Sequence, residues 1–317
     1  HGARISTYTE VFGARPTDGE AIELLARDAL QGREQRVHAH AVINAAGAWA
    51  DRVRATLLRS LKPGTPDPAP LLRPSRGVHL VFPSLTRGHG LVLFAREDDR
   101  VFFVIPFGNR SLVGTTEAEV PSPPEPESLQ PSVEEVRYLQ HELRRVLPRP
   151  AEQPVLAVTS GLRPLLASTE PVGSAPREHR VVEDGPLITV VGGKYTTFRV
   201  MAMDALRAAV QRLQRVGFRL QDAVAPLPAP PGAGATVESL AEFAADAAFA
   251  RRIEDVVRRR SALWLEPDGG RLAAQAVATV LARRLGWSGE RTREEIEFFH
   301  ARLEREDRLL RSLREDP

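Results

Sequence analysis

Two adjacent glycines lie between a strand pattern and a helix pattern. The apolar run Pro186–Val191 predicts a short buried strand, and Val200–Val210 has the apolar spacing of a helix. Gly192 and Gly193 are therefore expected at a strand-to-helix turn, where backbone without Cβ atoms can approach a ligand closely. The first turn of a helix also offers unpaired N–H groups and the positive end of its dipole. The turn is suited to an electron-rich ligand.

The residues after the two glycines strengthen this expectation. Lys194 adds a full positive charge, and Thr196 and Thr197 add hydroxyl groups at capping positions. The alternative is a structural helix start capped by threonine, with Lys194 in solvent. Short glycine motifs occur by chance, so the turn alone does not decide between the two interpretations.

A second stretch earlier in the chain repeats the layout. Val37–Gly47 predicts a strand that ends in small residues, and Ala48–Leu58 has helical spacing. Ala46 and Gly47 are thus also expected where backbone passes near a ligand. Tight packing of a strand against a helix is the alternative.

The segment between these two turns predicts an antiparallel sheet. Four successive strand patterns, rather than alternating strands and helices, favour antiparallel pairing; they cover Gly77–Phe82, Gly90–Phe94, Val101–Phe107 and Ser111–Thr116. Val133–Leu147 predicts an amphipathic helix with Val136, Leu139, Leu143 and Val146 on one face. Further strands are expected at Ser6–Phe12, Glu20–Leu25, Val155–Leu165 and the pair His179–Glu183 with Leu187–Val191. The fold class is mixed α/β (α+β).

Two polar side chains lie within these strand patterns. His79 is inside a strand, where a neutral imidazole could accept a proton near neutral pH, or where it could be a hydrogen-bonded core histidine. Arg163 follows a glycine and precedes a proline, which holds its backbone extended. An arginine among apolar residues needs an anionic partner or solvent, so an internal salt bridge is the alternative to ligand binding.

The composition changes in the last third of the chain. Residues 1–220 form the first predicted domain, 221–236 a proline-rich linker, and 237–317 an arginine-rich helical domain. The apolar positions of its expected helices are Leu240, Phe243, Ala247, Ala250, Ile253 and Val257, followed by Ile296, Phe299 and Leu303.

Charge and cysteine content narrow the function classes. The formal net charge is only +2, which gives no reason to expect a nucleic-acid partner, and the chain has no cysteine, which excludes disulfides, thiolate metal ligands and thiol nucleophiles. No metal site is expected. No apolar run approaches the ~20 residues that span a bilayer. The chain begins with His1 rather than Met, so we expect a fragment.

Together these stretches resemble FAD-dependent glycerol-3-phosphate dehydrogenases of the aerobic type. The motifs that carry the resemblance, in chain order, are Asn44–Trp49, Arg76–His79, Val104–Pro106 with Gly114–Thr116, Ser160–Leu165, Gly192–Arg199 and, in the tail, Glu254–Arg260 and Leu285–Ser288. The resemblance covers about residues 5–305. It implies an amine-oxidase-like flavoprotein fold whose substrate-domain sheet is antiparallel, followed by an all-helical C-terminal domain.

The resemblance also implies an activity and a set of site residues. It implies oxidation of sn-glycerol 3-phosphate to dihydroxyacetone phosphate, with hydride passing to flavin N5 and electrons passing to a quinone. Ala46, Gly47, Gly192, Gly193, Lys194, Thr196 and Thr197 are expected against FAD. His79, Arg163 and Lys194 are expected to be catalytic, and Arg163, Lys194, Arg199 and Thr116 to bind substrate. A cytoplasmic location with peripheral contact at the inner face of the membrane is implied, and a homodimer is left open.

One departure from the family pattern is clear. The strand, Gly-x-Gly-x-x-Gly turn and helix that hold the ADP half of FAD are absent from the sequence. We therefore expect a C-terminal portion that by itself binds FAD weakly and is inactive. Two alternatives stay open: a flavin oxidoreductase of the same fold that acts on an amino acid or 2-hydroxy acid, and an inactive module that binds a phosphate ligand.

Overall fold

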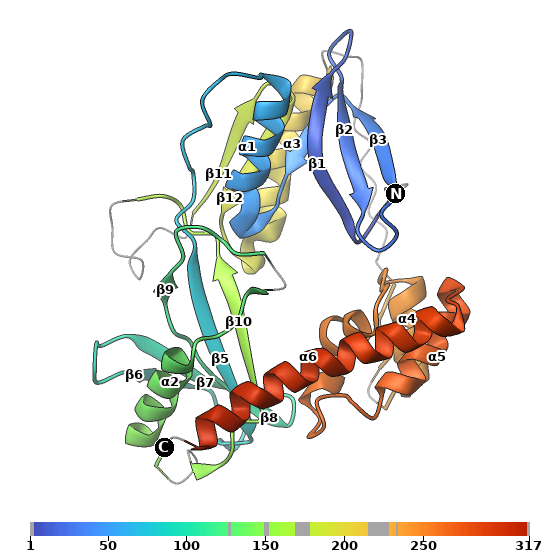
Figure 1. The fold of residues 1–317 in the computed structure, drawn as a ribbon. Helices are drawn as coiled ribbons and strands as arrows, with labels where there is room; N and C mark the ends of the chain where they lie inside the picture. Colours follow the sequence, from blue (N-terminus) through green and yellow to red (C-terminus); the bar gives the residue numbers. More distant parts are fainter. Residues whose placement is uncertain are drawn as a thin grey trace.

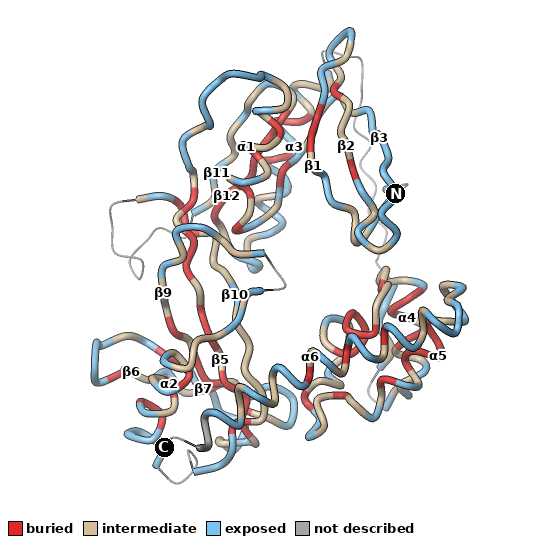
Figure 2. Tube along the Cα trace, in the orientation of Figure 1, coloured by how far each residue is buried: buried red, intermediate tan, exposed pale blue. Residues whose placement is uncertain are grey.

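A computed structural model describes residues 3–125, 128–148, 152–168, 178–214, 228–232 and 234–315. The chain forms three parts, which Figure 1 shows as an upper lobe, a lower lobe and a helical region beside them. We call them the turn lobe (residues 3–61 and 178–214), the sheet lobe (75–163) and the helical domain (236–315). Buried residues gather separately in each part (Figure 2).

The turn lobe contains two small sheets and two helices. β1 (Thr9–Pro16), β2 (Ile22–Asp28) and β3 (Glu34–Ala39) form an antiparallel sheet. β11 (His179–Asp184), β12 (Leu187–Gly192) and β4 (Val42–Asn44) form the second, in which β12 and β4 are parallel. Its two faces are covered by α1 (Ala50–Leu61) and α3 (Phe198–Gln214). The expected single strand Val37–Gly47 is wrong, because the chain leaves one sheet after Ala39 and enters the other at Val42.

The sheet lobe is a six-stranded antiparallel sheet with one covering helix. Its strands are β5 (Ser75–Pro83), β6 (Leu91–Phe94), β7 (Val101–Phe107), β8 (Arg110–Gly114), β9 (Ala118–Glu119) and β10 (Ala157–Arg163). The order is β10-β5-β8-β7-β6, with β9 paired to β5, so the four predicted strands are joined by two more. The antiparallel sheet is confirmed.

One face of this sheet is covered by α2 (Val133–Val146), which begins with a capping box between Ser132 and Glu135. Val136, Leu139 and Leu143 are fully buried as predicted, whereas Val146 is 36% exposed because it lies in the last turn, beyond the sheet. The opposite face of β6 and β7 leaves large apolar side chains exposed, which are Val92, Phe94, Val101, Phe103, Ile105 and Phe107.

The two lobes are joined by a narrow two-stranded ribbon, formed by residues 71–73 and 165–167. Arg73 N donates to Leu165 O (2.8 Å) and Ala167 N donates to Leu71 O (2.9 Å). Leu72 and Leu166 pack with Ala50 of α1 and Val191 of β12. The ribbon therefore continues β5 and β10 into the core of the turn lobe.

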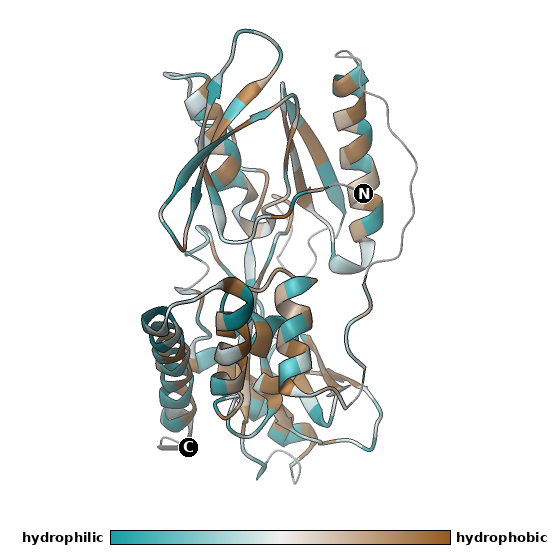
Figure 3. Cartoon of the chain, turned by 90° about the vertical axis from the view of Figure 1, so that its right-hand side faces the viewer, coloured by the Kyte–Doolittle hydropathy of each residue, from teal (hydrophilic) through white to brown (hydrophobic). Residues whose placement is uncertain are grey.

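The helical domain contains α4 (Val237–Asp246), a π-helical turn (Asp255–Arg259), a 3₁₀ turn (Leu263–Leu265), α5 (Ala274–Leu285) and α6 (Gly289–Glu315). Ala250, Ile253, Val257, Phe299 and Leu303 are buried as predicted. Leu240 and Phe243 are only half-buried, because the core side of α4 carries Ala241, Ala244 and Ala245 instead. Figure 3 shows α6, which runs toward the marked C-terminus, as a largely hydrophilic helix.

Half of the predicted linker at 221–236 lies outside the described residues, and the domain limits stay a prediction. Among the described residues, no helix has both the length and the apolar character needed to cross a bilayer.

Candidate functional site

The Gly192–Gly193 turn has the geometry that only glycine adopts readily. Both residues have positive φ, at 76° and 74°. A Cβ atom at Gly192 would collide with the backbone oxygen of Glu178, and one at Gly193 would collide with Met201. The turn then passes through a 3₁₀ turn (Tyr195–Thr197) into α3. The predicted strand-to-helix turn is confirmed.

The second small-residue turn lies beside the first. β4 pairs in parallel with β12, so the chain segments that leave the two strands emerge at the same edge. Gly47 has φ 58°, and buried Asn44 fixes this turn by accepting from Ala46 N (3.3 Å) and donating to Ala50 O (2.8 Å). Asn44 belongs to the Asn44–Trp49 motif but was not a predicted site residue, although its buried amide orients Ala46 and Gly47.

The two turns border a cavity of about 910 Å³ on the turn lobe. Its lining is mostly apolar and comes from four segments, which are Ile43 and Ala45–Trp49, Leu162 with Pro164, Val190 with Gly192–Tyr195, and Phe198, Met201, Ala202, Ala205 and Leu206. Small residues on the two turns leave room for a flat group against the backbone. The lining therefore fits a planar aromatic ring system such as that of a flavin, which can stack flat against the backbone of the turns.

His79 and Arg163 meet on the sheet lobe. Gly77 pairs with Gly161 on β10, and Arg163 lies two residues further along that strand. The missing side chain of Gly77 makes room for the guanidinium, because a Cβ atom there would overlap all three terminal atoms of Arg163. Gly114 pairs with His79 and likewise leaves space for its imidazole. Two strand glycines thus create the slot in which both side chains lie.

Three hydrogen bonds from Arg163 go to neutral oxygen atoms. Its guanidinium donates to Thr115 Oγ1 (2.8 Å), Thr116 O (3.2 Å) and Arg76 O (3.3 Å). These bonds orient the side chain within the slot. Both interpretations of Arg163, ligand binding and an internal salt bridge, stay predictions.

The environment of His79 favours its neutral form. Burial lowers the pKa of His79 below its usual value, and the positive charge of Arg163 lowers it further. A neutral imidazole at pH 7 can accept a proton, which is the state required of a general base.

Thr116 does not have the position expected of a substrate contact. It is 3% exposed, its hydroxyl donates to Glu135 Oε1 (2.9 Å), and it accepts from Val78 N (2.9 Å). Glu135 in turn pairs with Arg76 at 2.6 Å. The geometry therefore favours a structural role for Thr116, which ties α2 to the strand that carries His79.

The other predicted site residues divide into two groups. Lys194 is exposed at the rim of the cavity, and its backbone N and O both bond to the Thr197 hydroxyl (3.2 and 3.1 Å). Thr196 and Arg199 are exposed and do not line the cavity. Leu162 and Pro164 line it, whereas Arg163 between them donates to Thr115. The roles of these residues stay predictions.

Two further contacts near the site had no sequence signal. Thr115 accepts a hydrogen bond from Arg163 because the pairing of β8 with β5 brings these distant residues together. His179 contacts Asp204 of α3 (2.8 Å) beside Gly193, and this hydrogen bond holds the pKa of Asp204 below its usual range. Within the described residues, no three His, Cys, Asp or Glu side chains are grouped in a way that could hold a metal ion.

The fold and the site define the class of this protein. Residues 1–199 match the family of FAD dependent oxidoreductases (DAO), which is more than half of the chain. The chain therefore belongs to the FAD-dependent oxidoreductase family.

Relatives within this family share one name. The chain is 28% identical to "Glycerol-3-phosphate dehydrogenase" of Mycobacterium leprae, over 96% of this chain and 60% of that protein. It is 34% identical to mitochondrial glycerol-3-phosphate dehydrogenase of Macaca fascicularis, over 67% of this chain and 30% of that protein. The chain thus spans less than two thirds of the length of these relatives.

A solved structure supports the fold. The glycerol-3-phosphate dehydrogenase from Bacillus halodurans complexed with FAD matches with a TM-score of 0.71 at 19% identity, over 93% of this chain and 68% of that chain. At this identity the match establishes the fold, including the helical C-terminal region.

Proposed function

We propose that this chain carries the substrate-facing part of a glycerol-3-phosphate dehydrogenase, which oxidises sn-glycerol 3-phosphate to dihydroxyacetone phosphate. The observation that carries the proposal is the glycine-bordered apolar cavity of the turn lobe, and the sheet-lobe slot in which Arg163 and burial lower the pKa of His79 supports it. The relatives named glycerol-3-phosphate dehydrogenase support the choice of substrate.

Each group of residues has its own role in the proposed alcohol oxidation. When bound, FAD supplies the hydride acceptor at flavin N5. The backbone of Ala46, Gly47, Gly192 and Gly193 would hold the ring system, aided by Lys194, Thr196 and Thr197 at the helix start. His79 takes the proton from the substrate hydroxyl as the hydride leaves C2. Arg163, Lys194 and Arg199 attract the phosphate, for which a guanidinium fork beside a point charge is well suited.

We further propose that the activity needs polypeptide beyond these residues. The chain contains no Gly-x-Gly-x-x-Gly turn for the ADP half of FAD, and it covers 60% of the Mycobacterium leprae relative. Exposed apolar side chains support additional packing, both on α3 beside the cavity, at Phe198 (66%), and on β6, at Phe94 (63%). The chain alone is expected to bind FAD weakly and to be inactive.

Dye-coupled oxidation of glycerol 3-phosphate tests this function. The assay compares the chain with the same chain joined to the upstream region of its gene, with FAD supplied to both. Activity in the longer protein only is the expected result. Arg163→Ala or Lys194→Ala in the longer protein should reduce kcat/KM strongly, and near-normal kcat/KM in either variant would remove that residue from the site.

The same assay separates the other candidates. A flavin-loaded longer protein that oxidises an amino acid or a 2-hydroxy acid, but not glycerol 3-phosphate, would point to a different substrate in the same fold. Binding of glycerol 3-phosphate without turnover would point to an inactive phosphate-binding module. Tight yellow flavin on the chain alone would contradict the predicted weak binding.

The proposed acceptor is a membrane quinone, which implies peripheral contact with the inner face of the membrane. Reduction of a soluble quinone analogue by the longer protein, together with its sedimentation with lipid vesicles, is the expected outcome. Electron transfer to molecular oxygen alone would contradict the quinone assignment.

A further inference from the structure

The helical domain contacts the sheet lobe at the end of the sheet remote from the ribbon. Arg110 Nε donates to Leu265 O (3.2 Å), and the rings of Phe107 and Trp264 lie 6.2 Å apart. Near its end α6 places Leu310 against the core between α2 and the sheet. These contacts attach the helical domain to the sheet lobe through both apolar packing and hydrogen bonding.

The same domain contacts the turn lobe through two residues just before β1. Thr7 Oγ1 donates to Phe249 O (3.0 Å), and the hydroxyl of Tyr8 donates to Asp255 Oδ1 (3.0 Å). Tyr8 O accepts from Ala29 N (2.8 Å) after β2, which fixes Tyr8 to the β1–β2 hairpin. Figure 1 shows the N-terminal end with α4 and α5 on the right of the molecule, whereas β5 and β10, which the two-stranded ribbon extends, lie to the left.

The backbone at this contact is strained on both sides. Tyr8 and Phe249 each have φ 56°, in the left-handed region that bulky residues avoid. Such a conformation persists only where surrounding contacts compensate for its strain. Both strained residues lie at this interface, where Tyr8 bonds to Asp255 and Phe249 accepts from Thr7, so its contacts compensate for the strain.

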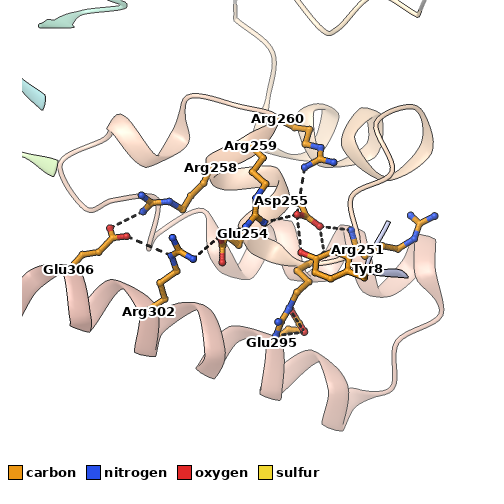
Figure 4. A network of polar contacts seen from close by, with 11 residues as sticks. Tyr8, Arg251, Glu254, Asp255, Arg258, Arg259, Arg260, Glu295, Arg302 and Glu306 are labelled. Carbon is orange, nitrogen blue, oxygen red and sulfur yellow. Dashed lines mark hydrogen bonds and ion pairs between the residues drawn. The ribbon is translucent and has the colours of Figure 1, made fainter. Parts of the chain in front are cut away.

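Asp255 is a rigid acceptor for Tyr8. It is 3% exposed and accepts from Arg251 N (2.8 Å), Arg252 N (3.1 Å) and Arg259 (2.8 Å). Figure 4 shows Tyr8 directed into this group, which belongs to the helical domain. Burial and the charge of Asp255 raise the pKa of Tyr8, so its hydroxyl keeps the proton that it donates.

Without the helical domain, the lobes meet only near the ribbon in the described part of the chain. Besides the ribbon, Trp49 Nε1 donates to Pro124 O (2.8 Å) and Arg52 pairs with Glu125. Trp49 directly precedes Ala50, which packs against the ribbon residues Leu72 and Leu166. A narrow connection of this kind is where hinge bending between domains occurs. A second attachment far from it removes that freedom.

We propose that the helical domain is a brace that fixes the angle between the turn lobe and the sheet lobe, with Tyr8 and Asp255 as its positioning pair. The brace holds the Gly192–Gly193 turn at a set distance from His79 and Arg163. The importance of that distance for catalysis rests on the proposed function, whereas the bracing of the two lobes is independent of it.

A spin-label measurement tests the brace on the chain without any need for activity. The chain has no cysteine, so Gln35→Cys on β3 and Arg87→Cys between β5 and β6, both exposed, give one label on each lobe. The expected result is one narrow distance population in the labelled chain. Tyr8→Ala, and to a lesser extent Tyr8→Phe, is expected to broaden it and to add a displaced population.

Tyr138 provides a matched control. Its hydroxyl donates to Asp98 Oδ1 (2.8 Å) within the sheet lobe, so Tyr138→Ala and Tyr138→Phe remove the same groups without touching the brace. These variants are expected to leave the distance population unchanged. Hydrogen exchange in α5 checks that the helical domain stays folded in every variant.

The outcomes separate a brace from a merely stabilising contact. A lowered Tm with an unchanged distance population in Tyr8→Ala would overturn the proposal, and so would equal broadening in the Tyr138 variants. A broadened population together with no glycerol 3-phosphate oxidation in the longer wild-type protein would leave the brace intact and overturn only the proposed function.

Discussion

The imidazole of His79 and the guanidinium of Arg163 affect each other's chemistry on the sheet lobe. Because the charge of Arg163 is one of two causes that lower the pKa of His79, Arg163→Gln is expected to raise that pKa. It should remain below the usual value, since burial is the larger cause and persists. NMR titration of the histidine ring signals measures the change. Arg180→Gln, an exposed change on β11, is the control, and an equal rise there would contradict the coupling.

His79 also makes stability depend on pH. Its pKa in the folded chain is lower than in the unfolded chain, so the unfolded state binds more protons as pH falls. This contribution is fully present above the unfolded pKa of about 6.5 and is lost as pH falls from that value through the lower pKa of the folded chain. Urea denaturation at pH 7.5 and 5.5 should show a smaller loss of stability in His79→Gln than in the wild type. An equal loss in both would contradict the assignment.

The slot that holds Arg163 depends on Gly77. In Gly77→Ala the new methyl group would occupy the position of the guanidinium, so Arg163 is expected to leave Thr115, and the pKa of His79 should rise as in Arg163→Gln. Gly161→Ala is the control, because a Cβ atom at this neighbouring glycine on β10 meets nothing within 4 Å. NMR titration of His79 in both variants decides the matter, and an unchanged pKa in Gly77→Ala would exclude this account.

The residues of the site differed in how far the sequence could place them. Gly192 and Gly193 were predictable because strand, turn and helix are all local patterns. The partners of Arg163 were not predictable, since Thr115 is 48 residues away and meets it only through the register of β10, β5 and β8. The bond of Thr116 to Glu135 was not predictable for the same reason, because it depends on how α2 crosses the sheet.

At the scale of the element, α2 provides a direct test of packing. Leu143 is fully buried against the sheet, whereas Val146, one turn later, is 36% exposed. Leu143→Ala should reduce the free energy of unfolding by about 2–5 kcal/mol, because it removes buried methyl groups and leaves a cavity. Val146→Ala should cost much less, about 0.5 kcal/mol. Chemical denaturation measures both, and similar losses would mean that the helix packs on a different face.

Elements with one uninterrupted period were predicted well, and elements with breaks were not. The alternating patterns of β7 and β8 and the helical spacing of α2 follow from local sequence. Val37–Gly47 has no proline or glycine before its last residue, so nothing local marks the change of sheet after Ala39. In α4 the small side chains of Ala241, Ala244 and Ala245 form the core because α5 packs closely there, which the larger neighbours Leu240 and Phe243 obscured.

At the scale of the molecule, the helical domain has a hydrophobic core of its own. Glu295 is 1% exposed and accepts from Arg252 Nε (3.1 Å), which joins α6 to the segment before the π-helical turn. Glu295→Ala leaves Arg252 without this partner and should destabilise the domain by about 3–5 kcal/mol. Glu294→Ala, whose side chain is 58% exposed, is the control. Hydrogen exchange should localise the loss to α5 and α6, and a uniform loss over all three parts would contradict an independent core.

The arrangement of the three parts could not be derived from the sequence. Periodicity identified a helical tail and an antiparallel sheet, but the brace depends on single contacts such as Tyr8 with Asp255, separated by 247 residues. No local pattern predicts a pairing over such a distance. The strained φ of Tyr8 likewise arises from the whole fold rather than from the preference of the residue.

The apolar side chains left open on β6, β7 and α3 have a consequence for handling the chain at high concentration. A formal net charge of only +2 at pH 7 gives little electrostatic repulsion between molecules, so these faces are free to associate. Lower pH makes the net charge of the chain more positive, which increases the repulsion between molecules. The same change removes the contribution of His79 to stability. Colloidal solubility and conformational stability therefore have opposite pH preferences in this protein, and the best storage buffer is a compromise between them.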